Sequence, residues 1–121
     1  MKTLGTLLAC ALLVCSSALA APAKQKVTLM KQWTGKGLEE VLKAYPGTPS
    51  LNDEYPAINA VSELRAAVAS TYPAAGPASH AVRIRELWWP QGDYILTFLL
   101  HFKEGKWVVL GATKWHKDVV F

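Results

Sequence analysis

Cysteine is nearly absent from this chain. Its two cysteines, Cys10 and Cys15, both lie within the first 15 residues. The remaining chain therefore has no disulfide, no thiol nucleophile and no thiolate ligand for a metal ion. Catalysis by cysteine and zinc binding by cysteine clusters are excluded for that part of the protein.

Long apolar runs are absent after residue 20. The one uncharged, mainly apolar stretch is Leu4–Val14, which is shorter than the roughly 20 residues that span a bilayer. Lys2 precedes it, and Ala18 and Ala20 supply the small residues of a signal-peptidase site. We therefore predict a cleaved signal peptide at residues 1–20, a periplasmic or secreted mature protein, and no transmembrane segment after cleavage. Lipidation at one of the two cysteines stays open as an alternative.

Strong charge of either sign is missing as well. Without residues 1–20, twelve Lys and Arg stand against nine Asp and Glu, and this net charge of +3 is too small to indicate nucleic-acid binding. The positive charges gather before Glu39, the first acidic residue. We expect residues 21–36 to form a basic N-terminal arm or a short strand, and residues 37–121 to form a single domain.

Two segments of the domain have a helical pattern. Apolar residues spaced three and four apart predict helices over Gly37–Tyr45 and Pro56–Thr71. Turn residues between them predict a loop over Gly47–Glu54.

Three later segments have the composition of strands. Runs rich in β-branched and aromatic residues predict strands over Ala81–Trp89, Asp93–Lys103 and Lys106–His116. The expected fold class is α+β: two helices on one face of a three- to four-stranded antiparallel meander sheet, in the order α-α-β-β-β, with room for an extra N-terminal strand. In element order alone, residues 37–116 resemble a truncated cystatin-like or nuclear-transport-factor-like cone.

The two hairpin loops predict the register of the sheet. Glu104 and Gly105 indicate a two-residue loop that places Phe102 opposite Trp107. Residues 90–92 indicate a three-residue loop between the first two strands. With this register one face of the sheet forms the core, and the opposite, outer face is also apolar through its middle. That outer face carries Leu87, Ile95, Leu99, His101, Val108, Leu110 and Ala112, with Arg83, Arg85, Lys106 and Lys114 around them. An uncovered apolar face indicates an interface, unless the N-terminal arm or a helix covers it.

Glu86 is the most unusual residue of the predicted core. By alternation it lies between Ile84 and Trp88 on the core face, opposite Leu96. A carboxylate there would be desolvated, which raises its pKa and makes it a candidate site residue. The alternative is an edge strand or a bulge that turns Glu86 to water.

No complete catalytic or metal set can be built from the other residues. In the predicted register His116 lies beside Asp93, about 27 Å from His101 at roughly 3.4 Å per residue, so the two histidines share no metal. His116 and Asp93 lack a nucleophile. We therefore expect no catalytic residue, no metal ligand and no cofactor. Trp89, which points outward in this register, is a candidate contact for a peptide or a sugar.

Two functions are consistent with these features. We expect an exported, non-enzymatic envelope protein that binds a protein or peptide partner, or a second copy as a homodimer, through the apolar outer sheet face, like an inhibitor or immunity factor. The alternative is a small cone-fold ligand binder or enzyme with a pocket around Glu86, using Tyr45 or Tyr72. The candidate binding residues are Trp89, Leu99, Leu110, Arg83, Arg85 and Glu86. A flat open sheet would favour the first function, and a deep cavity at Glu86 the second.

Overall fold

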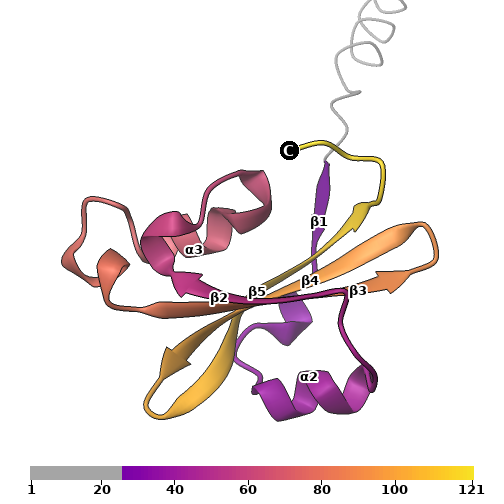
Figure 1. Cartoon of the computed structure of the whole chain (residues 1–121), viewed down its shortest axis with the longest axis horizontal. Coiled ribbons are helices and arrows are strands. Elements are labelled where there is room, and N and C mark those ends of the chain that lie inside the picture. Colours follow the sequence, from indigo (N-terminus) through magenta and orange to yellow (C-terminus); the bar gives the residue numbers. More distant parts are fainter. Residues whose placement is uncertain (1–25) are drawn as a thin grey trace, which may run out of the picture.

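A five-stranded antiparallel sheet forms the centre of the molecule (Figure 1). The structure, a computed structural model, describes residues 26–121, so the predicted signal peptide and both cysteines lie outside the described residues. The strand order across the sheet is β1-β5-β4-β3-β2. The strands are β1 (Val27–Leu29), β2 (Leu51–Pro56), β3 (Arg83–Gln91), β4 (Tyr94–Lys103) and β5 (Lys106–His116). The α+β class and the β3-β4-β5 meander are confirmed, and the sheet has one further strand at each edge.

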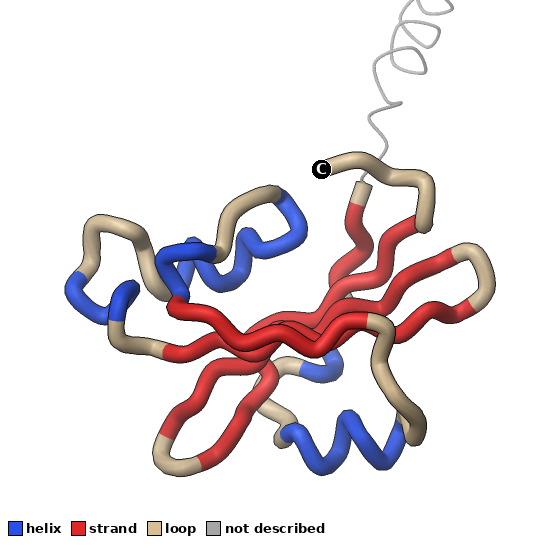
Figure 2. Tube along the Cα trace, viewed as in Figure 1, coloured by secondary structure: helices blue, strands red, loops and turns tan. Residues whose placement is uncertain are grey.

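The two α-helices pack on opposite faces of this sheet (Figure 2). Helix α2 (Leu38–Ala44) and the 3-10 turn η1 (Lys31–Trp33) cover one face, which we call the α2 face. Helix α3 (Ala66–Thr71) covers the other, the α3 face, together with η2 (Ala57–Asn59), η3 (Glu63–Arg65) and η4 (Pro77–His80). The prediction that both helices share one face is therefore wrong. None of the helices in residues 26–121 is long and apolar enough to cross a membrane.

Helix α2 begins and ends where the sequence predicts. Gly37 is its N-cap, and the Gly37 N–H donates to the Glu40 carboxylate at 3.0 Å, as in a capping box. Tyr45 is the C-cap, directly before a proline. Val41 is fully buried against the sheet, whereas Leu42, predicted to share its apolar stripe, is 43% exposed.

The second predicted helix is much shorter than its sequence pattern indicates. Residues 51–56 were expected to form a loop and a helix start, but they form β2 and pair with β3. Ser62 has φ of 88° and ψ of 161°, which is far from helical, and helix α3 begins only at Ala66. Pairing with a neighbouring strand therefore outweighs the poor strand propensity of Asn52, Asp53 and Glu54.

The turn between β3 and β4 has two central residues, not the predicted three. Gln91 pairs with Tyr94, and Gly92 between them has φ of 62°, which the first central position of a type II′ turn requires. The predicted register was wrong by an odd number of residues, and an odd shift turns every β3 side chain to the other face. As a result Glu86 pairs with Leu99 on the α3 face.

The β4–β5 turn agrees with the sequence. Glu104 and Gly105 have φ of 53° and 77°, so both central residues are left-handed, as in a type I′ turn. Phe102 pairs with Trp107 as predicted.

A β-bulge then changes the register of β5. The pairing shifts by one residue near the middle of β4, which leaves Leu110 as the extra residue. Gly111 consequently faces α3, where a Cβ on Gly111 would lie 2.9 Å from the Ala67 Cβ. The absence of a Cβ at Gly111 therefore makes room for α3.

Each face of the sheet has its own apolar core. The α2-side core contains Val41, Leu87, Trp89, Leu96, Phe98, Leu100, Val109 and Ala112. Trp33 of η1 packs edge-on against Phe98, with ring centroids 5.3 Å apart. The α3-side core contains Ala57, Ala60, Val68, Ile84 and Leu99. The expected uncovered apolar face is therefore absent from the centre of the sheet in residues 26–121.

Candidate functional site

Glu86 lies at the centre of a buried polar cluster on the α3 face. Its side chain is 1% exposed. Oε1 accepts hydrogen bonds from the Tyr55 hydroxyl at 2.6 Å and from Arg65 Nε at 2.7 Å. Oε2 accepts from Arg65 Nη2 at 2.9 Å and from Trp88 Nε1 at 2.7 Å. Of the two alternatives for Glu86, the structure shows burial, because β2 covers the edge of β3.

This cluster has the properties of a structural clamp. Four donors use the acceptor sites of the Glu86 carboxylate, two of them from one bidentate guanidinium. The hydrogen bond to Glu86 raises the pKa of Arg65, so the guanidinium stays charged. Burial, followed by the hydrogen bond to Glu86, raises the pKa of Tyr55 well above its ordinary value of 10.0. The Tyr55 hydroxyl therefore keeps its proton near neutral pH, and the cluster ties η3 to β2 and β3.

His101 makes a second buried polar contact on the α3 face. Its Nδ1 lies 2.6 Å from the Tyr72 hydroxyl. Burial, and then the positive charge of Lys103, lowers the pKa of His101 below its ordinary 6.5. A neutral imidazole can accept a hydrogen bond from the Tyr72 hydroxyl at Nδ1, whereas a protonated imidazole donates from Nδ1 to the hydroxyl oxygen instead. Burial and Lys103 therefore favour the neutral imidazole over the protonated one.

His116 does not pair with Asp93, and that predicted contact is wrong. The two-residue β3–β4 turn places His116 opposite Tyr94 instead. His116 Nδ1 lies 3.6 Å from the Asp118 carboxylate, and the Asp93 carboxylate lies 3.4 Å from Lys117 Nζ. In the part of the chain that the structure describes, no group of three His, Cys, Asp or Glu side chains could hold a metal ion.

Three of the predicted binding residues lie inside the fold. Trp89 is 7% exposed and packs against Tyr45, with ring centroids 5.7 Å apart. Leu99 is 1% exposed on the α3 face, and the half-buried Leu110 packs against the same core. The expectation that Trp89 and Leu99 point outward is therefore wrong, and a sheet-to-sheet dimer is incompatible with α2 and α3.

Beyond α2, the β4–β5 hairpin carries two aromatic side chains on the α2 face, of which Phe102 is exposed and Trp107 is half-buried. Phe102 is 49% exposed, and its ring is T-shaped against Trp107 with centroids 5.2 Å apart. The guanidinium carbon of Arg85 lies 5.8 Å from the centroid of the Trp107 ring, a cation–π geometry. We call Arg85, Phe102 and Trp107 the hairpin surface. Its exposed neighbour Arg83 pairs with Glu54, Nε to Oε2, at 3.0 Å.

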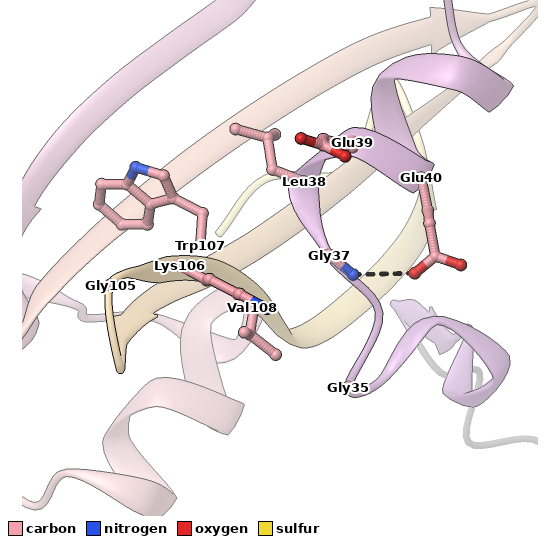
Figure 3. A pocket seen from close by; sticks show the side chains of 9 residues that line it. All are labelled: Gly35, Gly37, Leu38, Glu39, Glu40, Gly105, Lys106, Trp107 and Val108. Atoms are coloured by element: carbon pink, nitrogen blue, oxygen red, sulfur yellow. Dashed lines mark hydrogen bonds between the residues drawn. The ribbon is translucent and has the colours of Figure 1, made fainter.

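A groove of about 790 Å³ borders the hairpin surface (Figure 3). Leu38 and Glu39, at the start of α2, form one wall, and Lys106 and Trp107 of the hairpin form the other. The two walls are joined by backbone pairing, since the Val109 N–H donates to the Lys36 carbonyl at 2.7 Å. The groove is therefore preformed in the fold.

A second, smaller cavity of about 360 Å³ runs along α2 beside Trp33 and Lys43. Glu86 lines neither cavity. The two cavities therefore place open space on the α2 side, away from the buried polar cluster.

Sequence reasoning assigned both Phe102 and Trp107 to the core, and it missed the exposure of Phe102. Trp107 is half-buried and packs against the α2-side core. A length argument could have found the exposure of Phe102. Helix α2 has 7 residues and is about 10 Å long, whereas the 10 residues of β4 extend about 34 Å. One such helix cannot cover a whole strand, so Phe102, near the turn, stays exposed. Arg65 carried no sequence signal, because its partner lies across the sheet.

No family model matches the chain, and neither a curated protein nor a solved structure matches it. The functional conclusion therefore rests on the geometry of this chain alone.

Proposed function

We propose that this chain is an exported, non-enzymatic protein that binds a protein or peptide partner through the hairpin surface. The observation that supports it is the exposed Phe102 ring against the half-buried Trp107 ring, with Arg85 stacked on Trp107, beside a preformed groove. Export is indicated by the sequence of residues 1–20.

The residue types of the hairpin surface favour a protein partner. Tryptophan and arginine are enriched among residues that contribute most to protein binding, because each combines a large contact area with hydrogen-bond donors. Phe102 leaves about half of its surface in water at 49% exposure, an unfavourable arrangement that a partner would relieve. An interface inhibitor or immunity factor would use such a surface, whereas a catalyst would need a reactive group there.

The alternative, a ligand binder or enzyme around Glu86, is supported less well. Glu86 has its acceptor sites used by Tyr55, Arg65 and Trp88. A substrate would have to displace one of these donors from a nearly dry site, which leaves a buried group unpaired. The cavities lie elsewhere, so the cluster stabilises the fold and the hairpin surface carries the binding.

Site-specific photocrosslinking in the cell that produces the protein tests this proposal. A benzoyl-phenylalanine at Phe102 should give a discrete, ultraviolet-dependent adduct. The same label at Tyr94, which is 41% exposed at the β3–β4 end, is the matched control and should give none. Equal labelling from both positions, or no adduct from Phe102, would contradict binding through the hairpin surface.

A further inference from the structure

The charge balance of Arg85 differs from that of the other arginines. The chain has three, and two of them pair with a carboxylate: Arg65 with Glu86 at 2.7 Å and Arg83 with Glu54 at 3.0 Å. In the described residues, no carboxylate lies within 4.0 Å of Arg85. Its Nε donates instead to the neutral Asn52 Oδ1 at 3.2 Å.

The β2–β3 register shows why Arg85 has no carboxylate partner. Glu54 lies directly opposite Arg85 in the β2–β3 pairing, but its carboxylate contacts Arg83, two residues away along β3 on the same face. Two arginines thus share one acid on this part of the α2 face. Whichever arginine Glu54 contacts, one positive charge remains without a counter-charge.

Arg85 also has less water around it than a free surface cation. Its side chain is half-buried between Asn52 and the Trp107 ring. A partly desolvated cation gains more from a carboxylate than a fully exposed one, because the local dielectric is lower. The guanidinium keeps its terminal nitrogens available, and these can hold a carboxylate in a bidentate pair.

We infer that the partner delivers a carboxylate to Arg85, next to an aromatic or aliphatic side chain that packs on Phe102 and Trp107. The ligand class is therefore an acidic peptide segment with neighbouring apolar residues. This inference rests on the proposed function, since it names the chemistry of the partner at the same surface. Electrostatic complementarity of this kind gives specificity and faster association as well as affinity.

A pair of short peptides tests the charge requirement. The probes are acetyl-Gly-Phe-Glu-Phe-Gly-amide and the same peptide with Gln in place of Glu. Binding is followed by the chemical shifts of the Trp107 indole N–H and the Arg85 Nε–H in the isotope-labelled protein. We expect the Glu peptide to shift both signals, with a Kd about tenfold lower than that of the Gln peptide, as for one charge-assisted pair.

Two variants test whether Arg85 causes the difference in Kd between the Glu and Gln peptides. Arg85→Gln should reduce the ratio of the two Kd values to about one. Lys103→Gln also removes one positive charge, from the neighbouring strand β4, but Lys103 lies on the α3 side, in line with His101, and should keep the tenfold ratio. Arg85 is half-buried and Lys103 is exposed, and unchanged circular dichroism checks that both variants fold.

The outcomes separate the inference from the proposed function. Equal binding of the two peptides, no shift with either, or a ratio that survives Arg85→Gln would each overturn the acidic-peptide inference. The crosslink from Phe102 is scored independently of these peptides. An adduct there with no charge preference would leave the binding function standing and reject its acidic chemistry, whereas loss of the adduct rejects the binding function itself.

Discussion

The pair of Arg65 and Glu86 allows a sharp test of how the fold is held together. Arg65→Met removes the guanidinium and leaves the Glu86 carboxylate, whose side chain is 1% exposed, without its counter-charge. Removing one partner of a buried pair costs about 3–5 kcal/mol. The Arg65 side chain is 25% exposed, so water can enter the vacated space, and we expect the lower end, about 3 kcal/mol.

The same substitution should cost much less once the acid is gone. In a Glu86→Leu background no buried carboxylate remains. Arg65→Met there removes only the packing of a partly exposed side chain and the hydrogen bonds from Arg65 Nη1 to the Val61 carbonyl and Ser62 Oγ. These exposed contacts contribute about 1 kcal/mol. The two costs of Arg65→Met should therefore differ by about 2 kcal/mol, which is the coupling energy of the pair.

Urea unfolding followed by circular dichroism measures each cost. For a domain of this size, with an m-value of about 1.5 kcal/mol per M, a loss of about 3 kcal/mol lowers the midpoint by about 2 M. Tyr55→Phe is the milder companion variant, because it removes one hydroxyl donor and should cost about 1 kcal/mol. If Arg65→Met costs the same in both backgrounds, the clamp described above does not exist.

Three further predictions follow from packing and protonation. Gly111→Ala should lower the free energy of unfolding in urea by about 1–3 kcal/mol, because its Cβ would lie 2.9 Å from the Ala67 Cβ. The loss should be clearly smaller in an Ala67→Gly background. Equal losses in both backgrounds would mean that α3 does not pack closely against β5 at Gly111. The lowered pKa of His101 means that its stabilising contribution is present above pH 6.5 and is lost as pH falls toward the folded pKa. His101→Gln should therefore lose less stability than the unsubstituted protein between pH 7 and 5; an equal loss in urea unfolding would contradict this assignment. Trp33→Ala should cost about 3 kcal/mol, whereas no change would show that η1 adds little to the core.

The sequence could predict the elements whose signals are local. Helix α2 has its N-cap, its acids and its terminating proline within about ten residues, and the β4–β5 turn has its glycine at the position that needs positive φ. Both were predicted within one residue. Glu86 was singled out because a charged residue interrupts an apolar alternation, and that too is a local observation.

Long-range pairing explains what sequence reasoning missed. Residues 51–56 have turn composition and become a strand only because β3 offers an unpaired edge. A two-residue turn at Gly92 and Asp93, read as a three-residue loop, moved the β3 side chains to the wrong face. The sequence around Leu110 contains no signal for the bulge, and the sequence around Arg65 contains none for its ion pair with Glu86. The end of the α2 face near the β4–β5 turn is partly exposed because α2 is too short to cover it. Hydrophobic periodicity does not report the length of sheet that a helix covers.

The ends of the described chain lie together, far from the hairpin surface. Val27 pairs with Trp115, nine residues along β5 from the turn at Lys106, which is about 30 Å at 3.4 Å per residue. Lys26 Nζ donates to the Val120 carbonyl at 3.4 Å, so a short peptide linker could join the two ends into a circular permutant. For the same reason, a tether or reporter attached at the C-terminus would hold the molecule by one end of the sheet. Protein immobilised in that way would present Phe102 and Trp107 to the solution without further engineering.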